Sequence, residues 1–297
     1  MSDFREWEKA VDPEALVYPE NFGRWMSIDE TALSNGELYT VITNKERHGK
    51  KGALAALIKG TKNETVSKAL NKVPVARLMG VEEVTMDFAE SMDWICRTNF
   101  PNAKLTGDRF HIQQIVSEGV QEIRIELRRK AIDEENDLVM KMKKEKQTFR
   151  PKTYANGDTE KQLLTRGRYL LFKPSNQWTD SQRERAGILF VRFPKLEKAY
   201  HFSMMFRNIF ESAKTREKAG QRMKNWFSKA EGSGLSHLIS ASNTVQRNLG
   251  KVLNYFPEGS TNASAESFNA KLKGFRALVR GVRDIKFFLF RLETFYA

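Results

Sequence analysis

The chain has 297 residues, and its 50 Lys and Arg against 37 Asp and Glu give a formal net charge of +13 and an isoelectric point near 9.7. The single cysteine, Cys96, excludes an intramolecular disulfide and a cysteine-rich zinc site and fits a reducing cytoplasm. No window approaches the roughly 18 apolar residues of a transmembrane helix, and the N-terminus is too charged for a secretory signal. A basic surface attracts anionic membranes, ribosomes and nucleic acids alike, and we expect nucleic acid as the partner.

The first part of the chain predicts a mixed α/β fold with a five-stranded sheet. Residues 1–20 have no clear period and are expected to form a lead-in segment. Apolar or alternating runs then predict strands at 23–28, 37–43, 52–59, 81–86 and 103–106. Helical spacing predicts helices within 62–78, ended near Pro74, at 88–100 and from about 111 to about 130.

Beyond residue 130 the pattern becomes helical, with a basic, exposed stretch at 141–146. Aromatic residues at helical spacing in this region are expected in its core, although one of them could stack on an unpaired base: Phe202, Phe206, Trp178 and Trp226. The chain is therefore expected to divide into a lead-in segment at 1–20, a first core part at 21–130, a helical insertion at 131–255 and C-terminal helices at 256–297 that complete the core. Cys96 is expected as a buried filler.

Three acidic residues stand at the ends or on the face of different predicted elements. Asp29 follows the first strand, Asp87 follows the fourth, and Glu266 opens a basic helix. Each of these acids, taken alone, fits a purely structural role, because an Asp after a strand often caps a turn and a Glu on a helix often faces solvent. Together, in a basic protein, they predict a divalent-metal site that faces a polyanion.

Carboxylates that converge from separate elements can hold two divalent ions about 3.5–4 Å apart for phosphoryl transfer. Mg²⁺, or Mn²⁺ in its place, takes oxygen ligands and keeps several waters, so two or three carboxylates suffice. The chain offers no histidine or cysteine cage. The expected cofactor is therefore a pair of Mg²⁺ or Mn²⁺ ions on Asp29, Asp87 and Glu266.

The helix that carries Glu266 has two distinct faces. Helical spacing places on one face Asn262, Glu266, Asn269 and Lys273, and on another the apolar Phe268, Leu272 and Phe275, which suit packing under the sheet. From residue 271 to residue 291, seven basic residues oppose one acid. A solvated face is the alternative, but the imbalance favours contact with DNA phosphates by Asn269, Lys271, Lys273, Arg276, Arg280 and Arg283.

Four blocks of the sequence stand out together: Ser27–Thr31, Thr85–Asp87, Phe100–Ala103 followed by Gly107–His111, and Asn262–Lys273. In this order they resemble the DDE transposases of bacterial insertion sequences, in particular the group called ISL-three. The resemblance runs from about residue 20 to the C-terminus. It implies a ribonuclease H-like core with a helical insertion before the last helix, and a catalytic triad of Asp29, Asp87 and Glu266. Asp108 and His111 match the Asp-x-x-His signature of that family.

Two assignments stay open at this point. Asp108 also follows a strand and competes with Asp87 as the second metal ligand; we favour Asp87 because the fourth strand of such a core lies beside the first. His111, one turn into a helix, is either a capping or core polar residue or a functional one.

The expected function is metal-dependent DNA cleavage and strand transfer at insertion-sequence ends, by a homo-oligomer on DNA in the bacterial cytoplasm. Many relatives begin with a cysteine-rich zinc-binding segment and a helix-turn-helix, whereas about 20 residues precede the first predicted strand here. We therefore expect either that a separate helix-turn-helix protein recognises the ends or that the chain is a truncated copy. A ribonuclease H-like nuclease or resolvase is one alternative, and a non-catalytic DNA-binding protein derived from a transposase is another, although no acid is lost.

Overall fold

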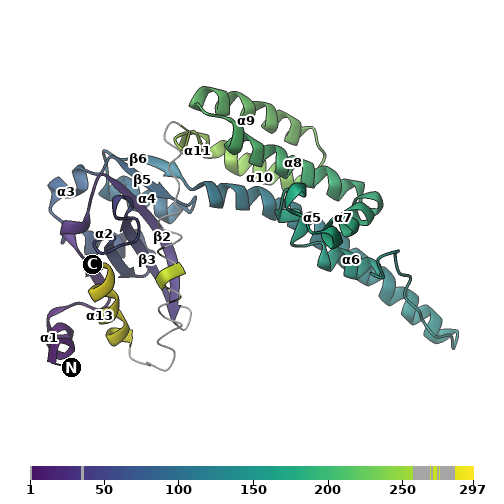
Figure 1. The fold of residues 1–297 in the computed structure, drawn as a ribbon, viewed down its shortest axis with the longest axis horizontal. Coiled ribbons are helices and arrows are strands. Elements are labelled where there is room, and N and C mark those ends of the chain that lie inside the picture. The colour runs from purple at the N-terminus through teal and green to yellow at the C-terminus, as the bar shows by residue number, and fades with distance from the viewer. Residues whose placement is uncertain (1, 35–36, 257–267, 269, 273, 275–284) are drawn as a thin grey trace. The chain divides into compact units, whose positions relative to one another are not determined.

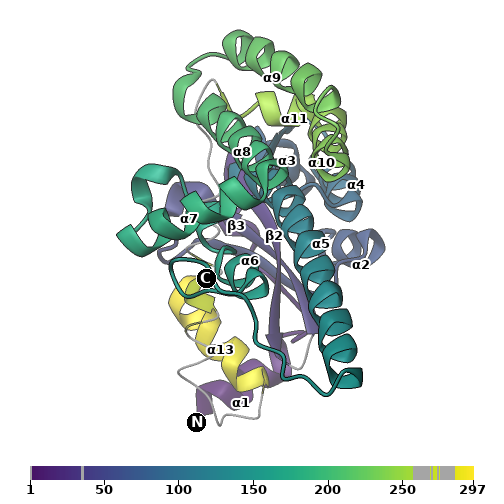
Figure 2. The same ribbon diagram turned by 90° about the vertical axis from the view of Figure 1, so that its right-hand side faces the viewer.

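The computed structural model describes residues 2–34, 37–256, 268, 270–272, 274 and 285–297. The chain forms two compact units. Unit 1 comprises Met1–His111 and Gly250–Ala297, and unit 2 comprises Ile112–Leu249. Unit 1 holds all the strands, and unit 2 is helical (Figures 1 and 2).

Unit 1 is built on a six-stranded sheet with the strand order β1-β4-β3-β2-β5-β6. The strands are β1 (Ala15–Val17), β2 (Trp25–Ser34), β3 (Glu37–Asn44), β4 (Leu54–Lys59), β5 (Glu83–Met86) and β6 (Lys104–Gly107). The first four strands pair antiparallel, while β5 lies parallel to β2 and β6 parallel to β5. The α/β class and the ribonuclease H-like order are confirmed, including the expected neighbourhood of β2 and β5. The number of strands was wrong.

The additional strand comes from the expected lead-in segment. After helix α1 (Ser2–Ala10), the three residues of β1 pair with Ala56–Ile58 of β4, and the 3-10 helix η1 (Pro19–Asn21) follows. A three-residue strand is too short to show an alternating pattern in the sequence. Only its pairing with β4 defines it.

The first core strand is also longer than predicted. It was expected to end before Asp29, but β2 continues to Ser34 and forms a hairpin with β3. Its parallel partner β5 pairs only as far as Ser27 of β2. Asp29 therefore lies within a strand, just beyond the point where the neighbouring strand ends.

Apolar side chains cover both faces of the sheet. One face packs under α2 (Asn63–Leu70) and α4 (Glu90–Asn99), with the buried core of β2 and β5 at its centre: Met26, Ile28, Val84 and Met86. The other face packs against α1 and α13 (Ile285–Tyr296), which lie beside each other (Figure 1). Cys96 is fully buried in the first cluster, as expected, and burial raises the pKa of its thiol to about 12.

Pro74 separates α2 from the short helix α3 (Val75–Met79), so the periodic stretch at 62–78 is two helices. A proline lacks the amide proton that a continuing helix needs.

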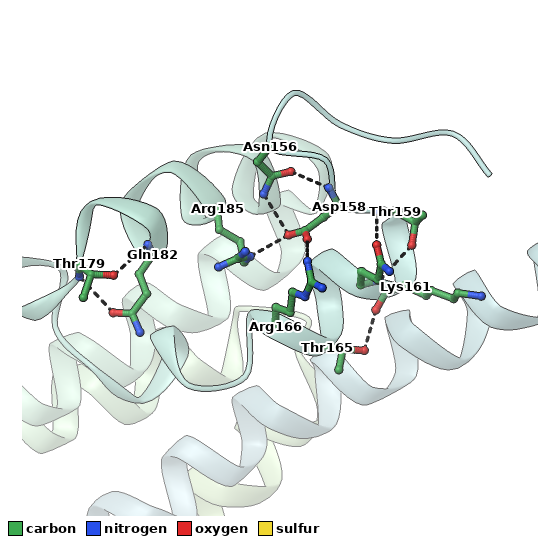
Figure 3. A network of polar contacts seen from close by, with 10 residues as sticks. Asn156, Asp158, Thr159, Lys161, Thr165, Arg166, Thr179, Gln182 and Arg185 are labelled. Atoms are coloured by element: carbon green, nitrogen blue, oxygen red, sulfur yellow. Dashed lines mark hydrogen bonds and ion pairs between the residues drawn. The ribbon is translucent and has the colours of Figure 1, made fainter. Parts of the chain in front are cut away.

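Unit 2 begins in α5 (Arg109–Lys144), which runs well past the expected end near residue 130. The further helices of unit 2 are α6 (Glu160–Arg166), α7 (Asp180–Arg192), α8 (Pro194–Ser212), α9 (Arg216–Glu231) and α10 (Ser236–Arg247), with α11 (Leu249–Leu253) leading back to unit 1. Capping boxes at Thr159 and Thr179 start α6 and α7, and Figure 3 shows both threonines. Over the described part of unit 2, extended pairing is limited to one isolated bridge between Thr153 and Thr159.

Of the four aromatic residues expected in the core of unit 2, Phe206 and Trp226 are buried, and Phe202 and Trp178 are half-buried. Trp226 and Phe206 are buried with ring centroids 4.7 Å apart, and the Trp226 indole donates to the Phe202 carbonyl. Trp178 is half-buried and donates to the carbonyl of Leu170. Within the described ranges, no helix has the length and apolarity needed to cross a membrane.

Candidate active site

Asp29 and Asp87 both follow the stretch over which β2 and β5 pair in parallel. The last pair is Ser27 with Thr85, and each aspartate comes two residues later along its own segment. Since Met26 and Ile28 point into the helix-covered core, alternation turns Asp29 to the other face of the sheet. The charge of Asp87 acts on Asp29, so the two acids lie near each other where β5 ends.

The pKa of Asp29 reports this crowding of negative charge. Burial raises it most, and the charges of Asp87 and Asp108 raise it further. The backbone amide of Glu30, which donates to Asp29 Oδ1 at 2.8 Å, and the charge of His111 act in the opposite direction. A positive charge at this point would relieve the repulsion.

Asp108 connects the end of β6 with the start of α5. Its own amide donates to the carbonyl of Met86, which extends the β5–β6 pairing, and its carboxylate is 2% exposed. Oδ1 accepts from the amide of Phe110, as in a helix cap, and Oδ2 lies 2.9 Å from Nδ1 of His111. Both oxygens of this carboxylate are thus engaged locally.

The imidazole of His111 is partly exposed beside the acids. Its pKa is raised first by the hydrogen bond to Asp108 and then by the charges of Asp108, Asp29 and Asp87, while burial lowers it. Since Nδ1 is bonded to Asp108, Nε2 is the ring atom left to meet a ligand. The His111 ring is therefore hydrogen-bonded to Asp108 and interacts electrostatically with Asp29 and Asp87.

Asp87 lies in a short turn between β5 and α4. Its Oδ1 accepts from the amide of Ala89 at 2.9 Å, and over the described residues no hydrogen bond engages its second oxygen. The next residue, Phe88, rests against Gly107: a Cβ on that glycine would lie 2.4 Å from the tip of the Phe88 ring. This contact holds the turn of Asp87 against the strand that leads to Asp108.

Glu30 is an acid of the site that the sequence did not single out. It is half-buried, and its pKa is raised by burial and then by the charges of Asp87 and Asp29. Strand alternation alone would place it on the face opposite to Asp29. Its position within the Ser27–Thr31 block, directly after Asp29, is the feature of the sequence that could have identified Glu30 as a site residue.

The donors at the site are carboxylate oxygens with one imidazole nearby, which suit a hard divalent cation such as Mg²⁺. Over the described ranges, no three His, Cys, Asp or Glu residues converge closely enough to hold a metal ion. Glu266 lies outside the described residues. The chemical type of these donors thus fits a divalent metal ion. Of the three predicted ligands, Asp29 and Asp87 lie within the described residues.

Of the predicted C-terminal residues, Asn269, Lys273, Arg276, Arg280 and Arg283 also lie outside the described residues. Lys271 is exposed, and its ammonium donates to the carbonyl of Gly49 at 3.1 Å. Phe268 and Leu272 are fully buried in the apolar cluster that contains Val41. Their expected packing under the sheet is confirmed.

The family model of the ISL-three group of DDE transposases, described as "Transposase", matches residues 26–292. No curated protein and no solved structure matches the chain.

Proposed function

The chain belongs to the ISL-three group of DDE transposases, and we propose that Asp29, Asp87 and Glu266 are the carboxylates with which it cleaves DNA and transfers the freed strand. The observation that carries this proposal is that Asp29 and Asp87 follow the paired ends of β2 and β5 and that their charges interact with each other and with Asp108 and His111. Shifted pKa values of acidic side chains that lie close together are typical of functional sites.

Glu266 is included in the proposed triad because of a described residue close to it in the sequence. Phe268, two residues later, is buried in the same apolar cluster as Val41, and Val41 is the direct cross-strand partner of Asp29. Cross-strand partners point to the same side of a sheet. The described residue Phe268, two positions after Glu266 in the sequence, thus belongs to the apolar cluster of the face that carries Asp29, and this supports including Glu266 in the proposed triad.

Asp29, Asp87 and Glu266 would hold two Mg²⁺ or Mn²⁺ ions through their carboxylate oxygens. When bound, such ions activate a water or a 3′-hydroxyl and stabilise the leaving oxygen. The raised pKa of Asp29 supports this placement, because it reflects negative charge that a cation would offset.

Asp108 serves in this proposal as a positioning residue. Its two oxygens are already engaged by the Phe110 amide and the His111 ring, whereas Asp87 keeps one oxygen for a ligand. Asp108 orients the His111 imidazole, whose Nε2 is available to donate to a phosphate oxygen. The basic residues of the C-terminal segment, Lys271, Lys273, Arg276, Arg280 and Arg283 together with Asn269, would contact the DNA backbone.

The test is cleavage of labelled duplexes that carry the element's ends, with Mg²⁺ or Mn²⁺ and with or without a helix-turn-helix partner. Removing the charge of a ligand in Asp29→Asn, Asp87→Asn or Glu266→Gln is expected to cost more than the roughly 10–100-fold typical of a supporting residue, and Asp108→Asn is expected to fall within that range. DNA binding in EDTA serves as the control that each variant is folded.

Two outcomes would change the assignment. Cleavage that persists in Glu266→Gln would remove this residue from the triad. If Asp108→Asn were inactive and Asp87→Asn active, then Asp108 would be the second ligand.

A further inference from the structure

Three arginines converge in unit 2 at a place that the catalytic proposal does not use. Arg124 and Arg128 lie one turn apart on α5, and Arg168 follows α6. In the part of the chain that the structure describes, no Asp or Glu forms an ion pair with any of the three. Arg124 is buried, Arg128 is half-buried and Arg168 is exposed, so the cluster reaches from the helix interface to the surface.

Hydrogen bonds fix the inner part of this cluster. The Arg124 guanidinium donates to the side chain of Gln121 at 2.6 Å and to the carbonyl of Leu164 at 3.0 Å. Gln121 in turn donates to the carbonyl of Arg168 at 3.2 Å, which ties the backbone of Arg168 to α5. All acceptors here are neutral, so the positive charge of Arg124 is not offset by them.

The outer guanidiniums are also held. Arg128 donates through Nε to the Thr165 hydroxyl at 2.8 Å. The guanidinium carbon of Arg168 stands 5.5 Å from the ring centre of Tyr169, whose own side chain is 66% exposed. Both arginines thus retain N–H donors that no described carboxylate takes.

The three charges repel one another. The pKa of Arg124 is lowered by burial first, and then by the charges of Arg168 and Arg128, while Glu122 opposes this with the smallest effect. Like charges held together by a folded scaffold are unfavourable unless an anion joins them.

Two other arginines of unit 2 show how this fold neutralises an arginine that has a structural role. Arg166 and Arg185 both pair with Asp158, which is fully buried, and Figure 3 shows them on its two oxygens. The fold therefore neutralises arginines with a carboxylate where their role is structural. Among the described residues, it supplies no such carboxylate to Arg124, Arg128 and Arg168, although Arg168 follows Arg166 by only two residues.

We propose that Arg124, Arg128 and Arg168 form a binding site for phosphates of the DNA backbone, in addition to the contacts expected from the C-terminal segment. The planar guanidinium matches phosphate oxygens in pairs, and such contacts fix position without reading sequence. The site rests on the proposed function in one respect, namely that DNA is the partner. It gives unit 2 a direct role in holding the substrate.

The test measures binding of the full chain to a labelled duplex in EDTA, by fluorescence anisotropy, from about 50 to about 200 mM salt. In Arg128→Gln/Arg168→Gln, the plot of log affinity against log salt is expected to become shallower by about 0.9 for each lost contact, so by one to two overall. Affinity near 0.1 M salt would then fall about tenfold per contact. The loss should be equal for an element end and for an unrelated duplex. Arg124 is left unchanged because its burial ties it to folding.

The matched control is Arg183→Gln/Arg222→Gln, which removes the same charge from two exposed arginines elsewhere in unit 2. An unchanged salt slope in Arg128→Gln/Arg168→Gln, or an equal change in the control pair, would overturn the site. A parallel assay of Asp29→Asn distinguishes the proposed DNA-binding site from the proposed catalytic site. That variant should bind DNA with the wild-type slope and fail to cleave, whatever the arginine variants do.

Discussion

Gly107 shows how one residue without a side chain can organise two loops of the candidate site. It ends β6 directly before Asp108, and the ring of Phe88, directly after Asp87, occupies the space where a Cβ would be. The distance between the turns of Asp87 and Asp108 is therefore set by a glycine–phenylalanine contact. The sequence predicted both aspartates at strand ends, but this contact between residues 19 positions apart has no signature in local periodicity.

We expect Gly107→Ala to reduce DNA cleavage by about a hundredfold, because the new methyl group must displace Phe88 and with it Asp87 by an amount of the order of 1 Å. The measurement is the cleavage rate of labelled element ends. Adding Phe88→Leu should restore much of the rate, since it removes the ring that collides.

The control for this pair is Gly187→Ala, a glycine within α7 with nothing within 4 Å of its added Cβ. It should leave the cleavage rate unchanged and stabilise the chain by about 0.5–1 kcal/mol. Full activity in Gly107→Ala would show that the spacing of the two turns does not matter.

The elements themselves were predicted where apolar patterning is strong and missed where it is weak. The strands that lie in the buried sheet were found, while β1, with three residues, was not. Helix α5 continues beyond residue 130 through a stretch whose apolar residues Leu138, Val139 and Met140 are exposed, so no buried apolar stripe marks it. The strand β2 continues past Asp29 because β3 pairs with it, and the sequence of β2 alone does not contain that information.

The start of α6 depends on a buried charge that can be tested by pH. Burial alone would raise the pKa of Asp158, but its pairs with Arg185 and Arg166 outweigh burial and lower it. A carboxyl whose pKa is lowered in the folded state stabilises that state above the unfolded pKa of about 3.9, and this stabilisation is lost as the pH falls through the folded value.

Asp158→Asn is therefore expected to lower the free energy of unfolding by about 3 kcal/mol near neutral pH, because it leaves two guanidiniums without their carboxylate. Urea unfolding of both proteins should give a constant difference down to about pH 5, which shrinks below about pH 3.9. A difference that does not depend on pH would mean that shape, rather than charge, is what Asp158 contributes. Asp180→Asn, on an exposed carboxylate at the start of α7, is the control.

Unit 1 is assembled from both ends of the chain, whereas unit 2 is one continuous segment. Unit 1 is closed by its C-terminal residues: Glu293 of α13 accepts from the Trp7 indole at 2.6 Å and from the Tyr18 hydroxyl at 2.8 Å. Phe288, Leu289 and Leu292 complete the apolar cluster on that face of the sheet. Unit 2, by contrast, has its own core and its own helix caps, as expected of an inserted domain.

A fragment of residues 108–249, begun at Asp108 to retain the cap of α5, is accordingly expected to fold alone. It should show helical circular dichroism and a single cooperative urea transition. A fragment of residues 1–111 should show no such transition. It lacks five buried side chains, each worth about 2–5 kcal/mol, against a total stability of about 5–15 kcal/mol for a typical domain: Phe268, Leu272, Phe288, Leu289 and Leu292. Cooperative folding of the 1–111 fragment would mean that the sheet and its first helices suffice, and that the C-terminal segment serves only the site.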